Sequence, residues 1–154
     1  MLENFINIDK AIFRFFNSTT ANPLFDLVMP IITDQNIWAI PILILICFLT
    51  IKGGRKGQIT SVILIIAVSL ADYSSAQILK PFFGRLRPSH EMLDGIRILM
   101  GKGGKYGFVS SHAANIYAAA VIFGYFYPKN KKIFFTIAAL VAFSRVYVGV
   151  HYPG

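Results

Sequence analysis

The feature that most constrains this chain is a set of long apolar runs that contain few or no charges. The clearest of them, from Ile37 to Ile51, has no charged residue at all. Runs of this size suit the hydrocarbon core of a bilayer. Of the 154 residues, 55% are hydrophobic and 14% charged, with a mean hydropathy of +0.60, which is too apolar for a polar surface in water. We predict an all-α, polytopic transmembrane helix bundle that forms a single membrane-embedded domain over residues 1–154.

Four spans are expected in this bundle, at about residues 37–51, 58–79, 107–127 and 133–148. In the first, Trp38 is predicted to anchor at the interface, Pro41 to lie in a first turn, and Cys47 to face lipid or fill a packing gap. The second contains one charge, Asp72. An ionisable residue within a span is by default a candidate functional residue, although Asp72 can equally form a hydrogen bond to a neighbouring helix.

The N-terminal segment, residues 1–35, is predicted to be interfacial rather than spanning. Its apolar residues are interspersed with Asp9, Lys10 and Arg14, a pattern typical of an amphipathic helix at the membrane surface. An unusually polar spanning helix that continues to Ile32 is the alternative. It is disfavoured by polar residues and a proline on its path, namely Asn17, Asn22, Pro23 and Asp26.

The net charge of +8 is carried largely by turns between the apolar runs, and not by one helix face. We therefore expect no nucleic-acid partner. Two short basic turns, 52–57 and 129–132, follow the first and third spans and so lie on one side of the membrane. The positive-inside rule makes that side cytoplasmic, and the opposite face then opens to the periplasm or the outside.

Three polar clusters converge on this opposite face. The first, from Lys80 to Pro88, follows the second span; the second, Ser110 to His112, opens the third; and the last, Arg145 to His151, closes the fourth. A transporter would place its polar groups at the bilayer midplane, so clustering at one face argues against that alternative.

The residue types in these clusters suit an anionic substrate. The planar guanidinium group of an arginine can donate two parallel hydrogen bonds to the oxygens of one phosphate. Lys80 and Arg87 would share a face in a helical register, although Pro81 and Pro88 oppose a strict helix. Ser110 and Ser111 stand where a helix begins and offers free N–H groups to an anion.

Histidines complete the pattern. His112 follows the two serines and is placed to donate a proton. Arg145 and His151 are six residues apart, on different faces of any continuing helix, so Gly149 is expected to end the helix and turn His151 back towards the site. Pro153 would suit the first turn of a further helix beyond residue 154.

The order and spacing of these motifs resemble the three-part signature of the type 2 phosphatidic acid phosphatase family, lipid phosphate phosphatases related to vanadium haloperoxidases. The matching stretches are Lys80-Pro-Phe-Phe-Gly-Arg-Leu-Arg-Pro88, Val109-Ser-Ser-His112 and Ser144-Arg-Val-Tyr-Val-Gly-Val-His151. Three matched parts are far more specific than one. A haloperoxidase itself is soluble, which the apolar runs exclude.

The resemblance implies a phosphohistidine mechanism. His151 would be the nucleophile and His112 the general acid, and the transferring phosphoryl would be held by five residues: Lys80, Arg87, Ser110, the backbone N–H of Ser111, and Arg145. Neither a cofactor nor a metal is expected, because cations are supplied by the chain and few carboxylates are available for a hard ion.

Two departures from the family pattern stand out. Val109 and Ser111 occupy places where the family usually has Pro and Gly. The third motif usually continues to an Asp four residues after its histidine, which would be residue 155; we expect the sequence to be a portion of a longer chain with a last helix beyond residue 154. A catalytically inactive lipid-binding protein is the alternative if that carboxylate is absent.

The expected partners are the bilayer and a phosphorylated membrane lipid, in the inner membrane of a bacterium. Compact bacterial members act on undecaprenyl diphosphate, phosphatidylglycerophosphate or the 1-phosphate of lipid A, and we favour one of the last two. Arg97, Lys102 and Lys105 hint at a bulky anionic head group, although singly they, like Arg85, are more often snorkelling anchors. His90 is read as a packed polar residue.

Overall fold

The computed structural model describes residues 2–91 and 94–154. Met1, Met92 and Leu93 of the predicted domain lie outside the described residues, as do the side chains of Leu2 and Glu3. Regular structure in the described part is helical apart from one isolated bridge between Leu86 and Tyr106. The helices are α1 Leu2–Arg14, η1 Phe15–Thr19, α2 Pro23–Thr33, α3 Gln35–Lys52, α4 Gly54–Tyr73, η2 Ser74–Leu79, α5 Lys80–Phe83, η3 Pro88–His90, α6 Ser111–Phe126, η4 Pro128–Asn130 and α7 Lys131–Tyr147.

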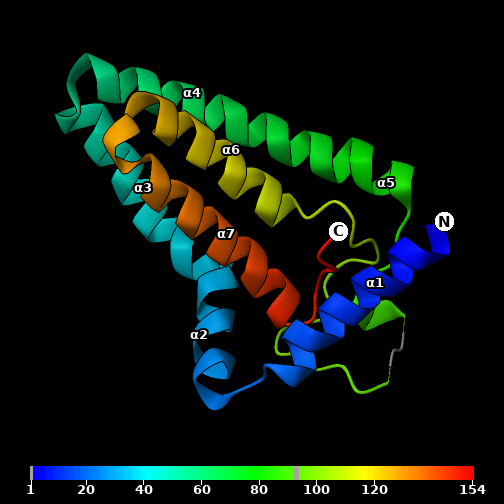
Figure 1. Ribbon diagram of the computed structural model, residues 1–154. Coiled ribbons are helices and arrows are strands. Elements are labelled where there is room, and N and C mark those ends of the chain that lie inside the picture. The colour runs from blue at the N-terminus through cyan, green and yellow to red at the C-terminus, as the bar shows by residue number, and fades with distance from the viewer. Residues whose placement is uncertain (1, 92–93) are drawn as a thin grey trace.

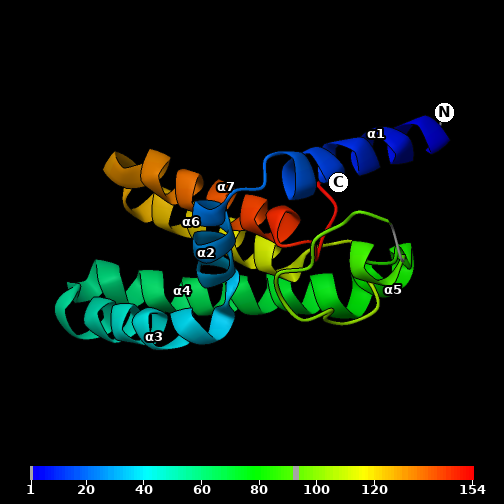
Figure 2. The same ribbon diagram turned by 90° about the horizontal axis from the view of Figure 1, so that it is seen from below.

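The bundle is built on one long rod made of α4, η2 and α5. It runs without interruption from Gly54 to Phe83, which is 30 residues, or roughly 45 Å at 1.5 Å per residue. A rod of this length exceeds the hydrocarbon core of about 30 Å, so its end must reach the interfacial region. Figure 2 shows α3 beside α4 in one layer and α6 beside α7 in another. Buried small residues of α6, Ala120 and Gly124, allow close packing.

Helix boundaries differ from all four expected spans; the fourth, for example, begins at Lys131 instead of residue 133. Asp34 caps α3 by accepting a hydrogen bond from the Asn36 N–H (2.9 Å), so the helix starts early and Pro41 lies inside it; its predicted place in a first turn was wrong. The rod begins at Gly54 instead of residue 58 and continues beyond 79. The third span begins at Ser111, not 107, because Ser110 is its N-cap.

The N-terminal segment is not one helix. An amphipathic helix is confirmed in α1, which buries Phe13 and exposes Phe5 and Ile8, whereas α2 is a separate short helix packed on α7. Helical structure is interrupted between them at residues 20–22. This is the region in which polar residues and a proline disfavoured a continuous spanning helix. Figure 1 shows α1 crossing the end of the bundle near the C-terminus.

The two basic turns lie at the same end of the bundle, opposite the polar clusters (Figure 1). Lys56, in the first turn of α4, places its Nζ 4.7 Å from the ring centre of Tyr127, which lies between α6 and η4. This arrangement agrees with the expected zigzag of spans. Cys47 is exposed on α3, on the surface that lipid would cover.

Candidate active site

The third motif positions His151 through a tight turn at the end of α7. The helix ends at Tyr147, and Gly149 adopts a left-handed φ of 85°. A Cβ at Gly149 would come within 2.2 Å of the Arg97 carbonyl oxygen, so both the conformation and the space require glycine. The N–H groups of Val150 and His151 then donate back to the Arg145 carbonyl, at 3.2 and 3.3 Å. His151 is thereby folded back beside Arg145, as expected.

The imidazole of His151 is 3% exposed, and its Nδ1 is hydrogen-bonded to the Gly107 carbonyl. A carbonyl can only accept, so Nδ1 carries the proton and Nε2 keeps its lone pair. Burial, with the positive charges of Arg87 and Arg145, lowers the pKa of His151 to about 2. The ring is therefore neutral at ordinary pH and oriented as a nucleophile requires.

Arg87 lies in the loop after α5 and is buried. The helix stops at Phe83 because Gly84 takes a left-handed φ of 57°, so Lys80 and Arg87 do not share a helical face. Instead the guanidinium of Arg87 donates to the carbonyls of Tyr106 (3.2 Å) and Val150 (3.3 Å), which ties the first motif to the third. Burial lowers the pKa of Arg87, yet guanidinium remains charged in proteins.

The serines of the second motif meet the first motif at the start of α6. Lys80 donates from Nζ to the Ser111 hydroxyl at 2.8 Å. Ser110 accepts the Ala113 N–H on its hydroxyl oxygen at 3.4 Å, which leaves its own O–H free to donate. Both hydroxyls stand at the positive end of a helix whose first N–H groups have no intrahelical partner.

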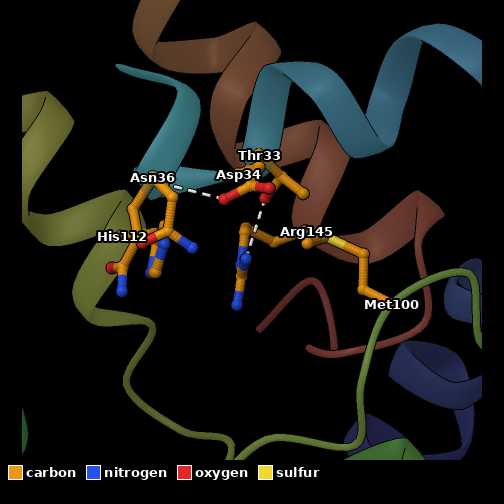
Figure 3. A pocket seen from close by; sticks show the side chains of 7 residues that line it. Thr33, Asp34, Asn36, Met100, His112 and Arg145 are labelled. Carbon is orange, nitrogen blue, oxygen red and sulfur yellow. Dashed lines mark hydrogen bonds between the residues drawn. The ribbon is translucent and has the colours of Figure 1, made fainter. Parts of the chain in front are cut away.

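Arg145 borders a cavity of about 160 Å³, shown in Figure 3. Arg145 is 8% exposed, and one of its terminal nitrogens donates to the Thr33 hydroxyl at 2.8 Å. Its Nε has no hydrogen-bond partner in the part of the chain that the structure describes. His112 lines the same cavity. An unpartnered buried donor beside a histidine is a place where an anion would be bound.

Cations at this end of the molecule fall into two groups. Arg85 and Arg97 were expected to be snorkelling anchors, but this was wrong: they are ion-paired with Asp9 and Asp26, respectively, and Lys10 pairs with Glu91 at 2.6 Å. These pairs hold α1 and α2 against the loop after α5. No salt bridge among the described residues involves the motif cations, Lys80, Arg87 and Arg145. Their charge is therefore available to an external anion.

Sequence reasoning missed the corner between α2 and α3. Thr33, Asp34, Gln35 and Asn36 line the cavity together with Met100. A signal was present, since this polar run precedes the first span and so falls on the same face as the motifs. Asp72, the ionisable residue within the second span, accepts a hydrogen bond from the Asn115 side chain at 3.0 Å. This bond joins α4 to α6, as the structural alternative for Asp72 expected.

Known proteins resemble this chain in sequence and in fold. Residues 58–154 match the PAP2 superfamily. A lipid A 4'-phosphatase from Porphyromonas gingivalis is 33% identical over 98% of this chain, which spans 66% of that protein's length. The crystal structure of Aquifex aeolicus LpxE superposes with a TM-score of 0.71 at 24% identity, covering 93% of this chain and 82% of the other. A transmembrane PAP2 type phosphatidylglycerolphosphate phosphatase from Bacillus subtilis gives 0.69 at 24% identity, covering 97% and 76%.

Proposed function

Since this chain belongs to the PAP2 superfamily, we propose that it is a membrane-lipid phosphatase. It hydrolyses a phosphate monoester of the lipid through a phosphohistidine intermediate. One observation carries the proposal: a buried, neutral His151 lies at one end of a transmembrane bundle among three cations that form no salt bridge with any carboxylate of the described residues. This combination supplies a nucleophile and an anion-binding site together.

In the proposed first step, Lys80, Arg87 and Arg145 hold the phosphoryl oxygens, with donors from Ser110 and Ser111. Nε2 of His151 attacks phosphorus and forms a P–N bond while the bond from phosphorus to the lipid oxygen breaks. His112 transfers a proton to that oxygen, so the lipid leaves as a neutral alcohol. The fixed cations stabilise the charge that spreads over the phosphoryl oxygens in the transition state.

In the second step, water attacks the phosphohistidine. His112, now neutral, accepts a proton from this water, and the P–N bond breaks to return His151 and release inorganic phosphate. The Gly107 carbonyl keeps the ring of His151 oriented throughout, because it accepts from Nδ1 in both states. The three cations replace the positive charge that a metal would provide, so we expect turnover to survive a chelator.

The proposed substrate is a phosphorylated glycolipid of the lipid A type, because a relative at 33% identity carries the name lipid A 4'-phosphatase. Phosphatidylglycerophosphate and undecaprenyl diphosphate remain the substrates to compare. The proposed location is a bacterial inner membrane. The basic turns at 52–57 and 129–132 support a site that faces the periplasm or the outside.

Substitution of the two histidines in the full-length protein tests the mechanism. His151→Ala should abolish both phosphate release and acid-labile labelling of the protein. His112→Ala should slow turnover by roughly 10² to 10⁴-fold, the usual contribution of general acid catalysis. A substrate with a good leaving group should partly rescue His112→Ala only. A phosphoenzyme in His151→Ala would refute the nucleophile, and lipid binding without any turnover by the wild type would favour an inactive lipid-binding protein.

A further inference from the structure

The cavity beside Arg145 extends beyond the residues of the three motifs. Arg145 and His112 form one side, and the corner between α2 and α3 forms the other (Figure 3). Asn36 and His112 both line this cavity, and in the close-up Thr33 and Asp34 are seen above Arg145. The corner thus meets both the anion-binding group and the proposed acid.

The side of the phosphorus on which the cavity lies can be worked out from the two histidines. The lining residues include His112 but not His151. In phosphoryl transfer the attacking and leaving atoms are roughly in line, on opposite sides of phosphorus. The general acid must reach the leaving oxygen. A cavity that touches the acid and not the nucleophile therefore lies on the leaving-group side.

We propose that the segment Thr33–Asn36 is a leaving-group subsite that selects lipid monophosphates whose phosphate is attached to a neutral, hydroxyl-bearing head group. This inference rests on the proposed phosphatase function and adds the part of the substrate that the site recognises. The cavity has a volume of about 160 Å³, which is below the roughly 300–1,000 Å³ of cavities that enclose a drug-sized ligand. Only the phosphate and the head-group atoms next to it enter.

The side chains of the corner match hydroxyl groups. Asp34 accepts the Asn36 N–H on Oδ1 (2.9 Å), but an ionised carboxylate has about four acceptor positions, so it can accept from a hydroxyl as well. The side-chain amides of Gln35 and Asn36 offer both donors and acceptors. Thr33 is buried, and its hydroxyl oxygen accepts from Arg145 at 2.8 Å, which fixes the position of the guanidinium.

Asp34 also determines what the subsite rejects. When a lipid diphosphate is cleaved, the leaving group is itself a phosphate, and its negative charge would lie beside the carboxylate. The two negative charges repel each other, and the repulsion is stronger where water is partly excluded. The corner therefore favours monophosphates of sugars or polyols over diphosphates.

Asp34→Asn in the full-length protein separates charge from structure, because Asn caps a helix about as well as Asp. We would measure kcat/KM for phosphate release from a lipid A monophosphate and from undecaprenyl diphosphate in the same detergent micelles. The ratio of diphosphate to monophosphate activity should rise by about tenfold, the effect of roughly 1.4 kcal/mol of relieved repulsion. If the wild type does not cleave the diphosphate, Asp34→Asn should begin to do so.

A second pair of variants tests the amides. Gln35→Ala combined with Asn36→Ala should lower kcat/KM for the lipid A monophosphate about tenfold relative to phosphatidic acid, whose leaving group has no free hydroxyl. Gln58→Ala, which removes an exposed amide at the opposite end of the rod, should change neither ratio.

Equal changes on both substrates in every variant, with an active wild type, would overturn the subsite and leave the phosphatase function intact. No phosphate release by the wild type from any of these three lipids or from phosphatidylglycerophosphate would overturn the proposed function and the subsite with it.

Discussion

Two stretches of this chain, α3 and residues 144–152, are placed in opposite environments. In α3 the side chains point outwards, and Ile40 is 68% exposed. In residues 144–152 nearly every side chain is buried, with Tyr147 at 0%. Residues 144–152 contain Ser144, Arg145 and His151 among their apolar residues, whereas Thr50 is the single polar residue of α3 between Ile37 and Ile51. The two stretches accordingly have different coverings, protein around residues 144–152 and lipid around α3.

Polar groups show why the second stretch needs protein around it. Asn17 is fully buried and donates to the carbonyls of Arg97 and Tyr147, both at 2.8 Å, while its Oδ1 accepts the Arg97 N–H, also at 2.8 Å. Buried backbone groups next to the site are thereby satisfied. Lipid cannot form such bonds, so the site end requires α1, α2 and the described residues 84–91 and 94–110 as a covering.

The largest effect is expected where the protein covers a charge. Arg145→Ala should reduce kcat/KM by about 10² to 10³-fold, because a preorganised donor to the transferring phosphoryl is lost. Arg145→Lys should recover part of this loss, since it restores the charge but not the fork. Phosphate-release assays on purified protein measure both. Full activity in Arg145→Ala would place the phosphate elsewhere.

The next effect concerns the buried hydrogen bonds. Asn17→Ala should lower the free energy of unfolding by about 2–3 kcal/mol, because it leaves two carbonyls and one N–H without partners. Unfolding in detergent micelles gives this value. Asn130→Ala, in the exposed turn before α7, is the matched control and should stay near wild type. Similar stability of the two variants would contradict the contrast between the two ends.

A pH effect of intermediate size follows from His151. Its pKa is lowered to about 2 in the folded protein, against about 6.5 when unfolded. Between these values the unfolded state binds the extra proton, so stability falls as pH drops below 6.5, by about 1.4 kcal/mol per pH unit. Thermal unfolding at a series of pH values should show this slope, and His151→Gln should flatten it. An equal slope in both proteins would assign it to other groups.

The smallest effect is expected on the lipid-facing side. Ile40→Leu should change the free energy of unfolding by less than about 0.5 kcal/mol and leave turnover unchanged, because lipid adapts to either side chain. A loss of activity there would indicate that α3 contacts something more specific than bilayer lipid. The same two assays serve for this variant.

Much of the fold followed from local sequence. Apolar runs mark the spans because a bilayer imposes their length and composition. The turn at Gly149 was predictable because Arg145 and His151 cannot both face the site along one helix. The family motifs predicted which side chains belong to the site, and the structure brings Lys80 to Ser111, Arg87 to the Val150 carbonyl, and Arg145 to the cavity that His112 lines.

Boundaries were less predictable, since they depend on single hydrogen bonds. Asp34 is the N-cap of α3, which therefore begins at Gln35, and Ser110 is the N-cap of α6, which begins at Ser111. Other polar residues nearby could also have served as caps. Apolar content varies little over these few residues. It therefore does not locate the cap.

Only the tertiary structure decided which cations have carboxylate partners. Arg85, Arg87 and Arg97 are each a basic residue between two spans, and the family motif singled out Arg87 without showing what the other two would bind. Folding brings Asp9 to Arg85 and Asp26 to Arg97, over separations of 76 and 71 residues. The Arg87 side chain donates instead to the carbonyls of Tyr106 and Val150. It also placed the Thr33–Asn36 corner opposite Arg145, 112 residues away from Thr33. Such pairings depend on how α1 and α2 cover the end of the bundle, and long-range packing of this kind leaves no local pattern in the chain.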